Sequence, residues 1–244
     1  MALIDNLIAA WELDEASGNA IDSHGANDLT ETGGTIATGT GLIYGSARDF
    51  EADDTEWFTI ADNTDVSAGD IDFSFEMWIK AESLTTFRAL FGKDNGGAGK
   101  EYNCYAYSNG NIQFNVSNSG LAEHGVVTAG AGSITTGNWI QVCCGHSATA
   151  NETWIAINAG TPATTSYSGG VQDGTAGFQI GALDSLGSQP FDGLIGPVRF
   201  WKRDIRSDIS ELYNSGSGRT YAYITGGGGG ATGAGFLLLL GCGA

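Results

Sequence analysis

The stretch Phe73-Ser74-Phe75-Glu76-Met77-Trp78-Ile79-Lys80 alternates apolar and mostly polar residues with a period of two. Successive side chains of a β-strand point to opposite faces, so this pattern predicts a strand with Phe73, Phe75, Met77 and Ile79 in the core. Trp78 then lies on the opposite face. A large aromatic side chain there needs a second layer of structure or a ligand to cover it.

The same alternation recurs along the chain. In residues 139–146, Ile140, Val142 and Cys144 share one face, and Asn109-Gly110 joins two further apolar runs with a strong hairpin signal. Other strands are expected at residues 7–12, 48–50, 57–60, 87–93, 102–108, 112–117, 154–157, 178–181 and 194–201. Only residues 207–213 predict a helix, with Ser207 as its N-cap. About a dozen short strands and one short C-terminal helix predict an all-β, two-sheet antiparallel jelly-roll sandwich.

Composition restricts the domain organisation and the partners. The chain of 244 residues contains 39 glycines and only 3 prolines, as expected for many strands joined by tight turns, and we expect one sandwich domain over residues 1–224. The net charge of −18, from 28 acidic and 10 basic residues, repels phosphate backbones and anionic lipid. The sequence therefore predicts neither a nucleic-acid partner nor membrane insertion.

The C-terminal residues 225–244 have a different character. A run of glycines is followed by the apolar residues Phe236, Leu237, Leu238, Leu239 and Leu240. Five apolar residues cannot span a bilayer, which takes about 20 in a helix. Because exposing them is costly, we expect them to dock, either on another copy of the chain or on the chain's own sandwich.

The N-terminus and the cysteines bear on the compartment. The start at Met1 lacks the basic and long apolar regions of a secretory signal, so we expect either a signal already removed or release by lysis, as for a virion protein. Cys104, Cys143, Cys144 and Cys242 show no metal-binding spacing and are expected to be reduced. The expected location is a virion, the extracellular space or a cell surface.

Several segments carry a family resemblance, in family order over residues 7–214. They are Gly45-Ser46-Ala47-Arg48-Asp49-Phe50, residues 73–80, Trp139-Ile140-Gln141-Val142, and Phe191-Asp192-Gly193-Leu194-Ile195-Gly196-Pro197-Val198-Arg199-Phe200-Trp201. Together they resemble the laminin-G-like or pentraxin-like branch of the concanavalin A-like jelly roll. Gln141 stands where the family has His, and Gly196 where it commonly has Asp.

The resemblance implies a possible calcium site and raises the question of catalysis. By position, the cation ligands would be Asp22, Asp49 and Asp192, since hard cations prefer carboxylate oxygens. The glucanases of this superfold use Glu-x-Asp-x-x-Glu on one strand. The segment Glu12-Leu13-Asp14-Glu15-Ala16-Ser17 begins this way, but Ser17 replaces the second glutamate, and we expect no enzyme.

A glycan site would combine an aromatic platform with directed polar groups. The candidate aromatic residues are Trp57, Trp78, Tyr102, Tyr105 and Tyr107, of which Trp78, Tyr105 and Tyr107 are predicted as ligand-binding. Packing in the core or on the sheets is the alternative for each.

The sequence leaves three functions open. The first is a non-catalytic structural or adhesion module, a subunit of a phage virion or another extracellular assembly whose C-terminal tail contacts other subunits. The second is a carbohydrate-binding lectin domain that recognises surface glycans, either with or without calcium. The third is a glycoside hydrolase.

Overall fold

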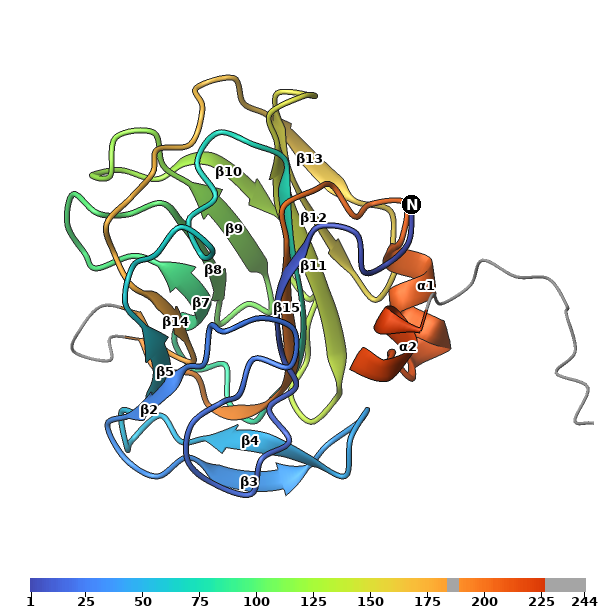
Figure 1. Cartoon of the computed structure of the whole chain (residues 1–244). Coiled ribbons are helices and arrows are strands. Elements are labelled where there is room, and N and C mark those ends of the chain that lie inside the picture. Colours follow the sequence, from blue (N-terminus) through green and yellow to red (C-terminus); the bar gives the residue numbers. More distant parts are fainter. Residues whose placement is uncertain (184–188, 227–244) are drawn as a thin grey trace, which may run out of the picture.

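The computed structural model describes residues 1–183 and 189–226, and it consists of two antiparallel sheets packed face to face (Figure 1). The eight-stranded sheet has the order β13 (Ala163–Ser166), β12 (Glu152–Ile157), β11 (Ile140–Ser147), β6 (Phe73–Ala81), β15 (Gly193–Trp201), β4 (Ser46–Phe50) and β3 (Ala37–Thr40), with β1 (Leu7–Trp11) paired to β15. The seven-stranded sheet has the order β10 (His124–Thr128), β9 (Ile112–Val116), β8 (Tyr102–Ala106), β7 (Arg88–Lys93), β14 (Phe178–Ile180), β5 (Trp57–Ile60) and β2 (Thr30–Thr32). The predicted all-β sandwich is confirmed.

The core lies between the two sheets and is built around β6. Phe73, Phe75, Met77 and Ile79 are all buried in one apolar cluster, as their alternation predicts. The ring centroid of Phe75 lies 4.4 Å from that of Phe91 on the opposite sheet. Burying such a side chain contributes about 1.5–3 kcal/mol relative to leaving it in water, so this strand fixes how the two layers pack.

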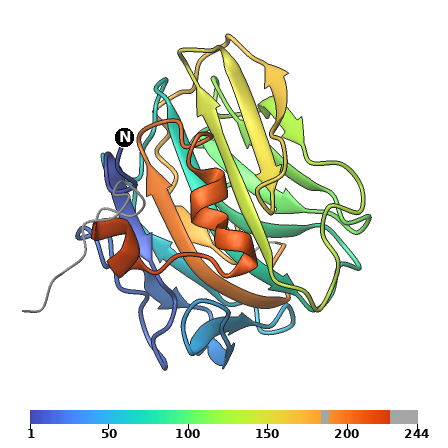
Figure 2. The same cartoon turned by 90° about the vertical axis from the view of Figure 1, so that its right-hand side faces the viewer.

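The outer face of the eight-stranded sheet is covered by the C-terminal part of the chain. Helix α1 (Ile209–Tyr213), the 3₁₀ turn η1 (Asn214–Gly216) and helix α2 (Tyr221–Thr225) lie over this sheet (Figure 2). Helix α1 begins at Ile209 with Asp208 at the N-cap position, one residue after the predicted Ser207. Helix α2 was not expected from the sequence; the Thr220 side chain caps it by accepting the N–H of Tyr223 at 3.3 Å.

The three cysteines among the described residues are buried in two apolar clusters. Cys143 packs in the cluster beneath the helices, while Cys104 and Cys144 lie in or beside the main core, and all three are free thiols. Among the described residues, no helix has the length and apolar character needed to cross a membrane. Cys242 and the predicted assembly residues Phe236 to Leu240 lie outside the described residues.

Candidate binding site on the seven-stranded sheet

A row of polar residues crosses the outer face of the seven-stranded sheet. The strand registers pair Thr59 with Gln179, Gln179 with Gly92, Gly92 with Asn103, and Asn103 with Asn115. Their neighbours along each strand point into the core, so these side chains point away from it. Gly92 interrupts the row, and no side chain fits there, because a Cβ would lie 2.8 Å from the Cβ of Asn103.

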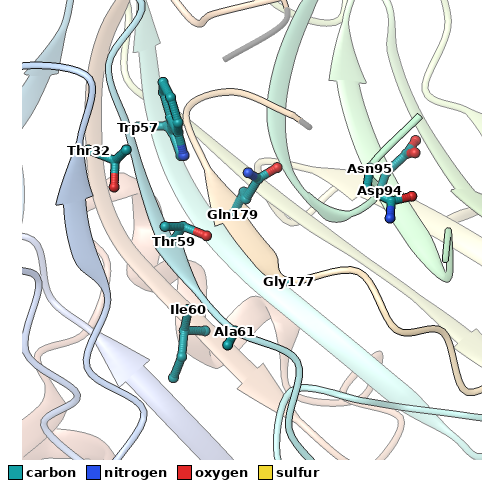
Figure 3. Close-up of a pocket in the computed structure, with 9 residues that line it drawn as sticks. All are labelled: Thr32, Trp57, Thr59, Ile60, Ala61, Asp94, Asn95, Gly177 and Gln179. Carbon is teal, nitrogen blue, oxygen red and sulfur yellow. The ribbon is translucent and has the colours of Figure 1, made fainter. Parts of the chain in front are cut away.

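One end of this row opens into a pocket of about 310 Å³, which we call the β5–β14 pocket (Figure 3). The indole of Trp57 and the hydroxyl of Thr59 come from β5, and the amide of Gln179 comes from β14. Asp94 and Asn95, which follow β7, form the facing wall. The lining residues are Thr32, Trp57, Thr59, Ile60, Ala61, Asp94, Asn95, Gly177 and Gln179.

The Asp94 side chain has four polar partners on this face. Its Oδ2 accepts the amide N–H of Asn103 at 2.7 Å and lies 3.4 Å from the hydroxyl of Tyr105 and 3.1 Å from the ammonium of Lys100. Its Oδ1 accepts the backbone N–H of Gly96 at 2.9 Å. These four donors fix the carboxylate, so the wall beside the pocket is held in place before any ligand arrives.

Two of the predicted ligand-binding residues lie near this wall. Tyr105 on β8 is 7% exposed, and its ring lies within 6.5 Å of that of Tyr107, centroid to centroid. Phe87, just before β7, packs against both rings. Burial and the nearby carboxylate of Asp94 raise the pKa of the Tyr105 phenol, so it is neutral and can donate a hydrogen bond. No sequence pattern indicated Phe87, because it is a single apolar residue at the start of a strand.

The other aromatic candidates are packed inside the protein, which corrects two expectations. Trp78 is only 1% exposed because Tyr213 stacks on it, with ring centroids 5.8 Å apart and planes 3° apart. The covering layer that Trp78 requires is therefore the chain itself and not a ligand. Tyr102 belongs to the core, where its hydroxyl donates to the carbonyl of Val66 at 2.6 Å.

The three predicted cation ligands do not form one group. The carboxylate of Asp22 is nearly buried and accepts the backbone N–H groups of Ala10, His24 and Asn27 at 2.9–3.0 Å. A carboxylate used in this way stabilises the opening turn. Its lone pairs are occupied by the chain's own donors.

Asp49 instead belongs to a group of carboxylates at the end of β4. Ligand oxygens of Asp49, Glu51 and Glu82 lie within 4.8 Å of one another, and Asp192 is close enough to affect the Asp49 charge. Burial and the neighbouring carboxylates raise the pKa values of Asp49 and Glu51. Sequence reasoning missed Glu51 and Glu82, since they follow strands β4 and β6 that are distant in the sequence.

The first residue of the glucanase-like segment is part of a buried ion cluster. Glu12 is 4% exposed and receives two hydrogen bonds from the Arg199 guanidinium, at 3.0 and 2.7 Å. Arg199 also donates to Glu76 at 3.0 Å. The carboxylate that would start a hydrolytic pair is thus committed to holding β1 against β15 and β6.

The structure is similar to several solved domains of toxins and of a glycoside hydrolase. Matches include the binding domain of Paraclostridial Mosquitocidal Protein 1 (13% identity, TM-score 0.70, 87% of this chain and 53% of that chain). Domain 4 of AbnA, a GH43 extracellular arabinanase from Geobacillus stearothermophilus solved with arabinotriose, also matches (20% identity, TM-score 0.61, 84% and 97%). A third match is botulinum neurotoxin type C, whose cell entry depends on two ganglioside molecules (15% identity, TM-score 0.63, 86% and 51%).

These likenesses establish the fold, and the family follows from the sequence. This chain spans about half the length of the two toxin chains that it matches. No curated protein matches the sequence. Residues 52–208 match a laminin-G-type family model. Since this match covers more than half of the chain, the protein belongs to the Concanavalin A-like lectin/glucanases superfamily.

Proposed function

We propose that this protein is a non-catalytic carbohydrate-binding module whose ligand occupies the β5–β14 pocket. The observation that carries the proposal is the lining of this pocket, where the Trp57 indole stands beside the Thr59 hydroxyl, the Gln179 amide and the Asp94 wall. The CH faces of a sugar ring pack on aromatic surface, while its hydroxyls need directed donors and acceptors. The pocket provides both kinds of contact.

The comparisons support a binding function of this kind. The arabinanase domain was solved with arabinotriose, and the type C neurotoxin uses gangliosides to enter cells. Both share the fold of this chain at 20% identity or less, so they support carbohydrate recognition as a class and do not identify the sugar.

The state of Glu12 supports binding without hydrolysis. A retaining glycosidase needs two accessible carboxyl groups about 5–5.5 Å apart on either side of the sugar. Glu12 is buried against Arg199, and Ser17 stands where the second glutamate of the motif belongs. The segment that most resembles a catalytic motif therefore stabilises the sandwich.

The pocket is tested by conservative changes at its two β5 residues. Trp57→Phe and Thr59→Ala should each weaken binding on a glycan array and in calorimetry by roughly tenfold, which corresponds to about 1.4 kcal/mol. Trp139→Phe is the control, because it makes the same change at a partly buried tryptophan that packs near Gly196 on the other sheet. Unchanged melting temperatures would separate a loss of binding from a loss of folding.

Two results would contradict the proposal. One is the absence of binding to every glycan on the array. The other is binding by a carbohydrate that both β5 variants retain at full affinity, since the sugar would then occupy another part of the surface.

We also propose that the module acts as an adhesion subunit of a larger assembly, such as a virion. The support is the apolar run at residues 236–240, which favours contact with another protein surface. Carbohydrate binding and assembly are compatible, because several copies of a weak glycan site together hold a glycan-bearing surface tightly.

A further inference from the structure

A second pocket lies on the other side of the Asp94 wall. It has a volume of about 210 Å³ and is lined by Phe87, Asp94, Lys100, Tyr105, Leu183 and Gln189, together with Gly96. We call it the Tyr105 pocket. Asp94 lines both pockets, so the two share a wall on the outer face of the seven-stranded sheet.

From this juxtaposition we propose that the Tyr105 pocket is a second sugar subsite and that the ligand is an uncharged oligosaccharide, with Asp94 as the positioning residue between the two subsites. The proposal rests on the carbohydrate-binding function proposed above and specifies its ligand class.

The aromatic wall of the Tyr105 pocket supports a sugar subsite. The side chain of Phe87 is 37% exposed, and its ring lies 5.1 Å from that of Tyr105 and 5.7 Å from that of Tyr107. Three aromatic rings thus form one partly open surface beside the polar groups of Lys100 and Gln189. This repeats the combination of ring and polar groups that Trp57, Thr59 and Gln179 form in the β5–β14 pocket.

The sizes of the pockets favour a ligand with more than one sugar. Small-molecule sites in proteins usually measure roughly 300–1,000 Å³. The β5–β14 pocket, at about 310 Å³, is at the lower end of this range, and the Tyr105 pocket, at about 210 Å³, is below it. A ligand confined to either pocket buries little surface. An oligosaccharide that lies along the sheet can occupy both pockets.

Asp94 connects the two subsites mechanically. The same Oδ2 atom is 2.7 Å from the Asn103 amide and 3.4 Å from the Tyr105 hydroxyl, so one carboxylate orients the middle of the polar row and the polar end of Tyr105. The hydrogen bonds extend from Asn103 to the next strand, since the Asn115 amide on β9 donates to the Asn103 side-chain oxygen at 2.7 Å. With its lone pairs satisfied by the chain, Asp94 holds Tyr105 and Lys100 in place, and these two residues line the Tyr105 pocket.

The charges around the wall determine the class of sugar. Lys100 is the cation of this site, and its Nζ lies between Asp94 at 3.1 Å and Glu123 at 3.5 Å. Two carboxylates around one ammonium leave the wall with a net negative charge, in a protein whose net charge is already −18. An acidic sugar is therefore repelled, while the hydroxyls of an uncharged one can use the same donors and acceptors.

Calorimetry on the full chain tests the proposal with two sets of probes. The first is the mono- to tetrasaccharide series of galactose, arabinose, xylose and glucose, and the second is galacturonic acid oligomers of the same lengths. We expect affinity to rise at least tenfold from monosaccharide to the longer oligomers of the preferred sugar. We expect the acidic oligomers to bind more weakly than the galactose oligomers by a similar factor.

Three variants assign these effects to residues. Phe87→Ala should lower the affinity for the longer oligomers toward that for the monosaccharide, whereas Leu42→Ala, at the same 37% exposure in the loop between β3 and β4, should leave the gain with length in place. Trp57→Phe should weaken both mono- and oligosaccharides. Asp94→Asn should reduce the difference in affinity between acidic and uncharged oligomers. If Asp94 had only a structural role, this difference in affinity would stay the same.

The possible failures are distinguishable. If mono- and oligosaccharides bind equally and Phe87→Ala has no effect, the second subsite is refuted while the proposed function stands. Preferential binding of galacturonic acid oligomers overturns the charge assignment. If no carbohydrate binds at all, the proposed function fails and this inference fails with it.

Discussion

Arg199 is a fully buried charge between two carboxylates. Burial alone would lower the pKa of its guanidinium, but Glu12 and Glu76 outweigh burial and raise it. Arg199 also donates to the backbone carbonyl of Arg219 at 2.7 Å, and so ties the C-terminal covering layer to the sheet. This single residue therefore connects β1, β6, β15 and the segment that leads into α2.

Replacing Arg199 tests this role. Arg199→Met should lower the free energy of unfolding by about 3–5 kcal/mol, because it leaves the buried carboxylates of Glu12 and Glu76 without their cation. Urea denaturation followed by circular dichroism measures the loss. The triple variant that adds Glu12→Gln and Glu76→Gln should recover much of it. A loss below about 1 kcal/mol in the single variant would show that the ion cluster contributes little.

The aromatic candidates show what sequence alone can say about single residues. Trp78 and Tyr105 both lie on the outer face of a strand, and the alternation of residues 73–80 predicted this for Trp78. What covers that face is set by other segments: Tyr213 stacks on Trp78, whereas Tyr105 borders a pocket. The residues that complete the site share no local motif, since Asp94 follows β7 and Gln179 lies on β14.

The strands of the sandwich differ in how clearly the sequence indicates them. Every interior strand of both sheets was predicted, because each places a regular apolar face in the core. The four strands that were missed are β2, β3, β10 and β13, which are the edges of the two sheets. Edge strands have fewer buried contacts and more polar or small residues, as in the mostly exposed Ala163–Ser166. Their sequence therefore lacks the alternation that marks a central strand.

The acidic group at the ends of β4 and β6 predicts a dependence of stability on pH. Burial and the carboxylates of Asp49, Asp192 and Glu82 raise the pKa of Glu51 above its ordinary value of 4.5. A raised pKa in the folded state means that folding favours the protonated form. The stabilisation is complete below pH 4.5 and is lost as the pH rises through the folded-state pKa.

Glu51→Gln isolates this contribution. At pH 7 the variant should melt at a higher temperature than the original chain, and the difference should shrink as the pH falls toward 4.5. We also predict that calcium, which can replace the missing protons, raises the melting temperature at pH 7 and that EDTA reverses this effect. The exposed Asp14→Asn, outside this group, is the control. Equal calcium stabilisation of the original chain and of Glu51→Gln would contradict calcium binding at this group.

For the molecule as a whole, the net charge of −18 and the apolar run at residues 236–240 have opposite effects on association between copies of the chain. The charge keeps copies of the sandwich apart, so association between copies requires a local apolar contact. Burying each of these five side chains contributes about 1.5–3 kcal/mol, which is enough to oppose the repulsion at moderate concentration. We therefore predict that the full chain self-associates and that raising the salt concentration strengthens association, since salt screens the repulsion.

Light scattering of the full chain tests this prediction against a variant with Leu237→Ser and Leu239→Ser, and against a control with Ala231→Ser and Ala234→Ser in the same segment. The leucine variant should remain monomeric where the original chain and the alanine control associate. Self-association should also increase the retention of the protein on an immobilised glycan surface, because several sites of one assembly then bind the same surface. The affinity for a soluble oligosaccharide should stay unchanged, since each such ligand binds a single site. If the leucine variant associates as strongly as the control, contacts between sandwiches are responsible. The relative positions of the glycan sites in the assembly would then depend on contacts between sandwich domains and not on the C-terminal segment.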